Sequence, residues 1–153
     1  MPEHESQTVV RRAVVALNGG PSDARIIGLA IDLARPSKAT LVGVHVVEND
    51  WTLPLDADVA GRSEETQRVL DLAEQIAEHA RYRIEPVLLQ ARDVGAALVD
   101  EATERSADIL IVGLPYRKRF GGDFAIGRTI PYVLKNAPCA VWVVRDPIPQ
   151  ERT

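Results

Sequence analysis

Five short apolar runs alternate along the chain with segments of helical periodicity, and this alternation restricts the fold more than any other feature. Continuous Val, Ile and Leu runs are typical of strands that are buried on both faces. Strict strand–helix alternation favours right-handed crossovers, which give an open, mostly parallel, Rossmann-like α/β sheet with helices on both faces. The five predicted strands are Ala13–Leu17, Thr40–Val47, Arg83–Ala91, Asp108–Gly113 and Cys139–Val144.

Helix start and stop signals lie between the predicted strands. Ser22 is the expected N-cap of a helix that Pro36 ends, and Asp93 is the expected N-cap of another that continues to Ala102. A long amphipathic helix follows Ser63, and the last helix passes through Val133 and Leu134, with Pro131 in its first turn. Asn49–Arg62 is predicted to be a long surface connection. Pro86 predicts either that its strand is an edge strand or that this position makes no ladder hydrogen bond.

The 153 residues predict one domain, with a tail at each end. We expect residues 1–10 and 146–153 to be tails and residues 11–145 to be the folded domain. Aromatic residues make up only 5% of the chain, so the core has to be built from aliphatic side chains.

Charge and composition exclude several kinds of partner and compartment. The net charge of −4 disfavours a nucleic-acid-binding role for the whole surface. No apolar stretch approaches the roughly 20 residues that span a bilayer, so no direct membrane insertion is expected. The first ten residues lack the apolar segment of a secretion signal, which predicts a cytoplasmic location. Cys139 lies in an apolar run and is predicted to be a small buried thiol in a reducing compartment.

Polar or glycine-rich segments follow three of the predicted strands. They are Asn18–Gly20, Val46–Glu48 and the loop after Gly113. Because the carboxyl ends of parallel strands lie on one edge of the sheet, the three segments are expected on one rim, where open α/β sheets bind ligands.

At residues 11–145 the chain resembles the universal stress protein family. The family's first strand ends in Asp-Gly-Ser, which corresponds to Asn18–Gly20, and its second commonly ends in His-Val, as His45 and Val46 do here. Its fourth strand carries Asp and Gly at the places of Asp108 and Gly113. The closing family pattern Val-Leu-x-x-Ala-Pro-Cys-x-Val-x-Val-Val matches residues 133–144 throughout.

The ATP-binding members of that family carry Gly-x-x-Gly, a spacer, and then Gly followed by Ser or Thr. Gly113 matches the first glycine, whereas the second falls on Tyr116. The spacing to Gly127 is one residue longer, Arg128 replaces the hydroxyl residue, and Thr129 comes one place late.

Two interpretations of this loop stay open. Arg128 and the basic run Arg117–Arg119 either form a changed anion site at a helix start, or they are a solvated charge run and a surface salt bridge. Gly121 and Gly122 add backbone freedom in the middle of the loop.

The resemblance implies a regulator that binds a nucleotide, with at most slow hydrolysis and no catalytic residue. The ligand would be ATP, AMP, a cyclic nucleotide or another phosphate-bearing compound; a requirement for magnesium is left open. Adenine would lie between Asn18 and Val46, and the phosphates would meet Gly113 and the start of the last helix. The predicted nucleotide-binding residues are Ala16, Leu17, Asn18, Val46, Gly113, Tyr116, Gly127, Arg128 and Thr129.

The resemblance also implies partners. Relatives form homodimers through their final strands, here Ala140–Val144, where an unpaired apolar edge is a liability. An alternative function is a module without nucleotide that regulates a transporter or a signalling protein, with Trp51 and the segment 116–120 as its contact surface.

Other chemistry has weaker support. The histidines His4, His45 and His79 lack metal-ligand spacing, and His45 is expected to have a structural role at a strand end. Residues 18–23 faintly resemble the phosphate loop of ATP pyrophosphatases, but a plain strand-to-helix turn explains them better. The pairs Glu64/Glu65 and Glu101/Glu104 are predicted to be exposed helix charges.

Overall fold

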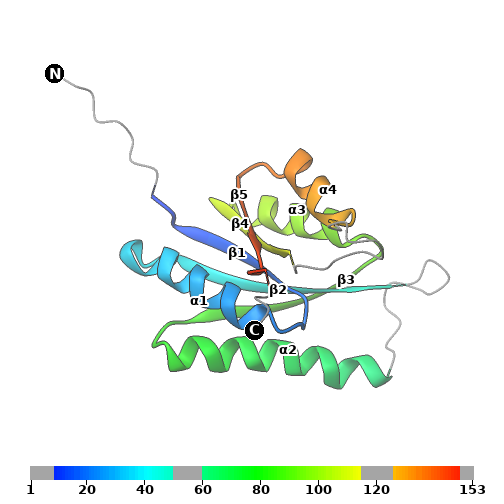
Figure 1. Ribbon diagram of the computed structural model, residues 1–153, viewed down its shortest axis with the longest axis horizontal. Helices are drawn as coiled ribbons and strands as arrows, with labels where there is room; N and C mark the ends of the chain where they lie inside the picture. Colours follow the sequence, from blue (N-terminus) through cyan, green and yellow to red (C-terminus); the bar gives the residue numbers. More distant parts are fainter. Residues whose placement is uncertain (1–8, 50–59, 115–125, 149–153) are drawn as a thin grey trace, which may run out of the picture.

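The chain forms one five-stranded parallel sheet, as the sequence predicts. The computed structural model describes residues 9–49, 60–114 and 126–148, and only the backbone of residues 60–63. The strand order is β3-β2-β1-β4-β5, and every neighbouring pair is parallel (Figure 1). The strands are β1 (Arg12–Leu17), β2 (Thr40–Glu48), β3 (Ile84–Ala91), β4 (Ile109–Leu114) and β5 (Ala140–Arg145).

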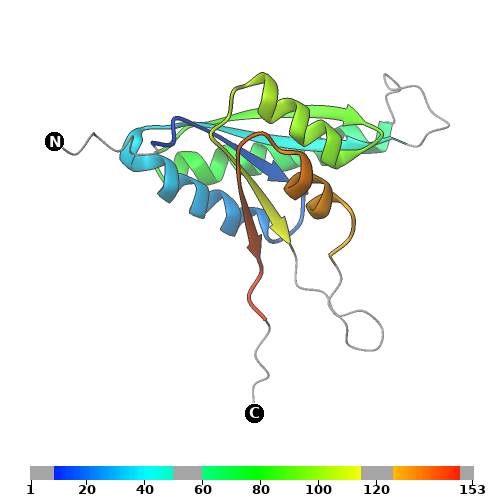
Figure 2. The same cartoon turned by 90° about the horizontal axis from the view of Figure 1, so that it is seen from above.

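Helices cover both faces of the sheet. Helices α1 and α2 lie on one face, and α3 and α4 lie on the other (Figures 1 and 2). The helices are α1 (Asp23–Ala34), the short 3-10 helix η1 (Arg35–Ser37), α2 (Ala60–His79), α3 (Val94–Glu104) and α4 (Thr129–Asn136). Within the described ranges, no helix is both long and apolar enough to cross a bilayer.

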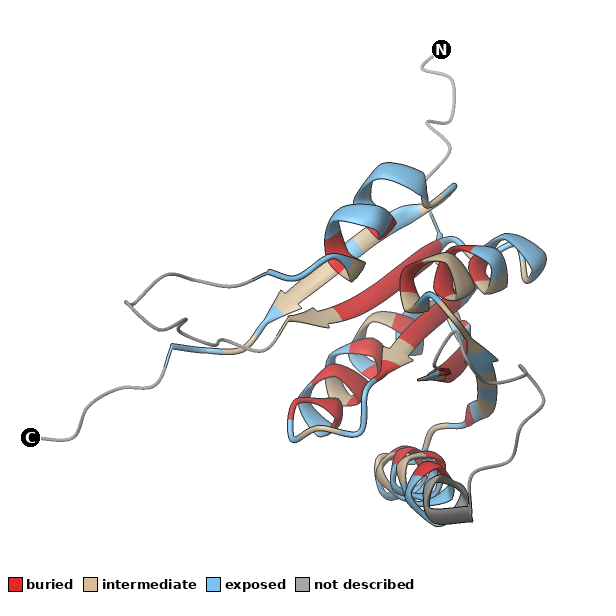
Figure 3. Ribbon diagram, turned by 90° about the vertical axis from the view of Figure 1, so that its right-hand side faces the viewer, coloured by how far each residue is buried: buried red, intermediate tan, exposed pale blue. Residues whose placement is uncertain are grey.

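Two aliphatic cores lie on opposite faces of the sheet. Successive residues of a strand point to opposite faces, so Val14 packs toward α3 and α4 while Val15 packs toward α1. The central strands β1 and β4 are therefore buried on both faces (Figure 3). This burial explains their continuous apolar runs and confirms the predicted core of Val, Ile, Leu and Ala.

Strands β3 and β5 form the two edges of the sheet. Strand β3 is an edge strand, which confirms the interpretation of Pro86, because proline lacks the N–H that a central strand needs. Strand β5 is the other edge. Asp93 accepts a hydrogen bond from Ala96 N at 3.0 Å and thus caps α3 as predicted, and Pro131 lies in the first turn of α4.

Three local predictions are wrong, and a fourth holds only in part. Ser22 is the N-cap residue of α1, as predicted, but its side chain makes no capping hydrogen bond, because its hydroxyl donates to Asp146 instead. The segment 49–62 is not one long connection, since α2 already begins at Ala60. Cys139 is only half-buried, although burial still raises the pKa of its thiol. Glu101 is not an exposed charge: it is largely buried and pairs with Arg105.

Candidate functional site

The carboxyl ends of β1, β2 and β4 meet at one rim of the sheet. Strand order reverses between β1 and β4, because the chain moves outward from β1 to β2 and β3 and then returns to β4 on the other side of β1. Open parallel sheets bind ligands at such reversals. The structure thus gives the rim that the sequence predicts.

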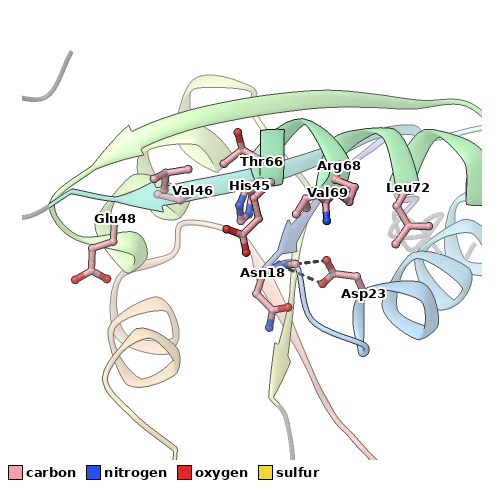
Figure 4. Close-up of a pocket in the computed structure, with 12 residues that line it drawn as sticks. Asn18, Asp23, His45, Val46, Glu48, Thr66, Arg68, Val69 and Leu72 are labelled. Atoms are coloured by element: carbon pink, nitrogen blue, oxygen red, sulfur yellow. Dashed lines mark hydrogen bonds between the residues drawn. The ribbon is translucent and has the colours of Figure 1, made fainter. Parts of the chain in front are cut away.

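A cavity of about 420 Å³ opens on this rim (Figure 4). Its walls come from the β1–α1 turn, the end of β2 and one side of α2. The lining residues are Asn18, Gly19, Asp23, His45, Val46, Val47, Glu48, Glu65, Thr66, Arg68, Val69 and Leu72.

The buried carboxylate of Asp23 holds the β1–α1 turn. It accepts hydrogen bonds from the backbone N–H groups of Asn18 (3.1 Å) and Gly19 (2.8 Å), drawn as dashed lines in Figure 4. The Asp23 side chain is only 3% exposed. Burial raises its pKa, and the hydrogen bonds from the backbone N–H groups of Asn18 and Gly19 oppose that shift. The turn is further fixed by Gly20 N, which donates to Asn18 Oδ1 at 2.7 Å.

His45 presents one ring nitrogen to the cavity. Its Nδ1 lies 2.9 Å from the carbonyl oxygen of Leu17. A carbonyl oxygen only accepts, so Nδ1 carries the proton, and in the neutral ring Nε2 is an acceptor. No described group pairs with Nε2, and His45 lines the cavity. The expected structural role of His45 is therefore present, and its second nitrogen adds an acceptor to the site.

The predicted base-binding residues divide into two groups. Asn18 and Val46 line the cavity. Leu17 is buried in the core on the α1/α2 side and offers only its backbone, and half-buried Ala16 packs toward α3 and α4. Neither Ala16 nor Leu17 lines the cavity.

Gly113 lies near the end of β4, where a side chain would meet the core beneath α1. A Cβ at this position would approach Ile26 Cδ1 of α1 to 2.3 Å. The missing side chain therefore lets α1 lie close against β4. Gly127 has a different reason to be glycine: its φ of +76° favours glycine, and nothing lies within 4 Å of its Cβ position.

Arg128 immediately precedes α4, and Thr129 is its first residue. The guanidinium of Arg128 lies 3.2 Å from Glu48 Oε1, and the Arg128 side chain is 80% exposed. This surface ion pair is weak and links the start of α4 to the end of β2. Tyr116, the run Arg117–Arg119 and Trp51 lie outside the described residues.

Helix α2 supplies a wall that the sequence analysis did not assign to the site. Thr66, Arg68 and Val69 line the cavity opposite the β1–α1 turn. The helical spacing of apolar residues predicts the apolar stripe that contains Val69. This spacing does not show that this part of α2 lies over the rim. The sequence signal for this wall was Thr66, a polar residue within the apolar stripe of the helix. In the structure, Thr66 is only 7% exposed.

Among the residues with a described position, no three metal-binding side chains cluster. The polar groups of the cavity are instead backbone amides, the Asn18 amide, the His45 imidazole, the Thr66 hydroxyl, carboxylates and Arg68. These donors and acceptors suit a neutral heterocycle with an attached group that carries hydroxyls.

Comparison with known proteins assigns the family. Residues 10–145 match the family model described as the Universal stress protein family. The chain belongs to this family, which confirms the resemblance seen in the sequence.

Solved structures of the family share the fold. One is a universal stress protein from Archaeoglobus fulgidus in complex with dAMP (19% identity, TM-score 0.70, 89% of this chain and 98% of that one). A second is a universal stress protein in complex with cAMP (22%, 0.67, 90% and 98%). A third, from Arabidopsis thaliana, has AMP bound (16%, 0.62, 88% and 90%).

One curated relative is a much longer protein. The chain is 30% identical over 136 residues to the sensor protein KdpD of Mycobacterium tuberculosis. The match covers 89% of this chain but only 14% of KdpD. The chain therefore spans about one seventh of that relative.

Proposed function

We propose that this chain is a regulatory domain that binds an adenine nucleotide at the rim cavity. The observation that carries the proposal is the cavity between the ends of β1 and β2, where a universal stress protein fold brings together backbone amides, Asn18 and His45. Family members in complex with AMP, dAMP and cAMP support this class of ligand.

The base and the phosphates occupy separate parts of the rim in this proposal. Adenine lies between Asn18 and Val46, and the phosphates extend toward Gly113 and the start of α4. There Gly127 and Thr129 offer backbone N–H groups at the positive end of a helix dipole, and Arg128 offers a guanidinium. Arg128 must exchange its ion pair with Glu48 for the phosphate, which costs little because that pair is exposed.

Replacing Arg128 by alanine tests the phosphate contact. We expect ATP to raise the melting temperature of the wild-type protein, and Arg128→Ala to weaken ATP binding about tenfold or more, because a charge-assisted contact is lost. The control is Arg25→Ala, an exposed arginine of α1 that does not line the cavity. Unchanged ATP affinity in Arg128→Ala would mean that Arg128 does not contact the nucleotide.

His45 predicts which base is preferred. The Nε2 acceptor suits the exocyclic amino group of adenine, whereas the carbonyl of hypoxanthine at the same position is repelled. We expect AMP to bind about tenfold more tightly than IMP, and His45→Phe to abolish that preference. Isothermal titration of both ligands measures the ratio, which is insensitive to a general loss of stability. An equal preference in wild type and variant contradicts this assignment of His45.

The second candidate function is an interaction module that works without nucleotide. The similarity to part of the sensor protein KdpD favours it, because that relative joins such a domain to a much longer chain. A signalling or transporter protein would then be the partner. Arg128→Ala separates the two functions, since it impairs ligand binding and leaves the partner surface largely intact.

We propose that the chain dimerises through β5. This edge contains no proline within Ala140–Arg145, and Trp142 on it is 42% exposed. The opposite edge, β3, contains Pro86, which weakens pairing there. We expect Trp142→Lys to convert a dimer to a monomer in light scattering, because a lysine on an edge strand disfavours pairing with another strand. Leu88→Lys on β3 should have no such effect.

A further inference from the structure

A second hollow lies at the opposite end of the sheet, and its lining is basic. It has a volume of about 570 Å³ and is formed where β2 and β3 begin. Lys38, Arg81 and Arg83 line it, together with a single carboxylate, Glu85. Glu85 is already paired with Arg105 at 2.8 Å. In the part of the chain that the structure describes, none of the three cations has an ion-pair partner.

The hollow is rigidly built. The hydroxyl of Tyr82 donates to the carbonyl of Ala39 and so joins the β2 side to the β3 side. The guanidinium of Arg35 lies 5.6 Å from the centre of the Tyr82 ring and donates to the carbonyl of Ala80 at 2.9 Å. These contacts fix the ends of α1 and α2 relative to each other. The backbone segments that carry the three exposed cations are therefore fixed around one space.

Two of the three cations occupy backbone positions that favour glycine. Lys38 has φ 54° and Arg81 has φ 57°. Each follows a helix and completes a closing turn, with Ala39 N bonded to Ala34 O and Tyr82 N bonded to Ala77 O. Long side chains are disfavoured in this left-handed conformation, where glycine is free of strain. The chain nevertheless places a cation at both positions, and both residues line the same hollow.

Part of this pattern has a purely structural cause, because cations stabilise the negative ends of helix dipoles. The end of α3 offers a comparison. Ser106 has φ 53° in the same kind of turn and carries no charge. Dipole stabilisation also does not explain Arg83, which lies beyond the end of α2 and faces the same hollow. Strained residues that gather at one surface are typical of binding sites.

We propose that this basic hollow, defined by Lys38, Arg81 and Arg83, is a docking surface for an acidic segment of a partner protein. Arginine binds carboxylates through two parallel hydrogen bonds, and a short acidic segment matches three cations around a compact space. The surface lies at the opposite end of the strands from the rim cavity. Partner docking is therefore compatible with a ligand at the rim, and the proposal does not depend on nucleotide binding.

The number of cations disfavours other polyanions. Nucleic-acid binding at physiological salt commonly uses about 6–10 phosphate contacts, and lipid-binding clusters commonly contain about 4–8 basic residues. Three cations on a chain of net charge −4 fall short of both. A localised carboxylate cluster is the partner chemistry that this small patch fits.

The glycine-like positions allow a test that separates binding from folding. The probe is a fluorescein-labelled oligoglutamate peptide, measured by fluorescence anisotropy in low-salt buffer. We expect Lys38→Gly/Arg81→Gly to lower its affinity about tenfold or more, while the melting temperature stays equal or rises because glycine relieves the strain. Arg25→Ala/Lys135→Ala removes the same charge elsewhere and should retain peptide binding, as should Ser106→Gly.

Two outcomes overturn the proposal. One is equal peptide affinity in the wild type, the double glycine variant and the charge-matched control. This result would mean that the cations stabilise the helix ends and do not bind the peptide. The other is a loss, in the double glycine variant, of binding to single-stranded DNA or to phosphatidylserine vesicles without any loss of peptide binding. The partner would then be of a different class.

Discussion

Replacing Gly113 by alanine is expected to lower the free energy of unfolding by about 2 kcal/mol. The added Cβ would lie 2.3 Å from Ile26 Cδ1, and Ile26 is 1% exposed in the core beneath α1. The methyl group has to push the isoleucine or the helix away from β4. Urea denaturation measures the loss as a lower midpoint at an unchanged slope.

The same substitution at Gly28 is a matched control. Gly28 lies within α1, and nothing lies within 4 Å of its Cβ position. Alanine is the better helix former, so Gly28→Ala is expected to raise the stability by about 0.5–1 kcal/mol. The two glycine-to-alanine changes should therefore have opposite signs.

A double-mutant cycle identifies the contact at Gly113. Ile26→Val removes the Cδ1 atom that the new methyl would meet, at a cost of about 1 kcal/mol by itself. In the combined variant we expect part of the loss to be recovered, with a coupling of about 1 kcal/mol. Strictly additive losses would contradict packing of α1 against β4 as the reason for this glycine.

Replacing Val69 by tryptophan is expected to weaken nucleotide binding by at least about 100-fold. Val69 lines the rim cavity from α2, and its Cγ2 would lie 3.1 Å from a Cβ placed at Gly19. The two walls already meet at this point, so an indole has room only within the cavity. Isothermal titration with ATP measures the effect.

The control for Val69→Trp is Leu29→Trp, which adds an indole on α1 at a side chain that is 38% exposed and outside the cavity. It should bind ATP as the wild type does. Circular dichroism and a thermal melt establish that both variants fold. Normal ATP binding by a folded Val69→Trp variant would mean that the base lies elsewhere.

The fold was predictable because two kinds of signal agree. Apolar runs such as 109–112 have no polar residue on either face, and their short length and β-branched residues favour strands that are buried on both sides. Pro86 lacks a backbone N–H, and Asp93 has a carboxylate that can cap a helix. Both effects are local, so a few residues of sequence are enough to predict them. The alternation of elements then left few topologies.

The site was less predictable because its parts come from distant segments. The end of β1 and the end of β2 follow from strand direction, whereas the α2 wall depends on how a helix starting at Ala60 lies over the rim. The expected capping hydrogen bond of Ser22 is absent for a similar reason: its hydroxyl donates to Asp146, which is 124 positions away in the chain. Gly113 matches a nucleotide-loop pattern, yet its contact with Ile26 gives it a packing role that the motif alone does not reveal.

The most direct test of nucleotide binding is to purify the wild-type protein and the Val69→Trp variant in parallel, denature both, and identify released small molecules by mass spectrometry. We predict an adenine nucleotide in the wild-type preparation at a much higher ratio to protein than in the variant. Titration with ATP, AMP and cAMP should then stabilise the emptied wild-type protein against heat. The contradicting result is a wild-type protein that releases no nucleotide and whose melting temperature none of the three ligands raises at millimolar concentration.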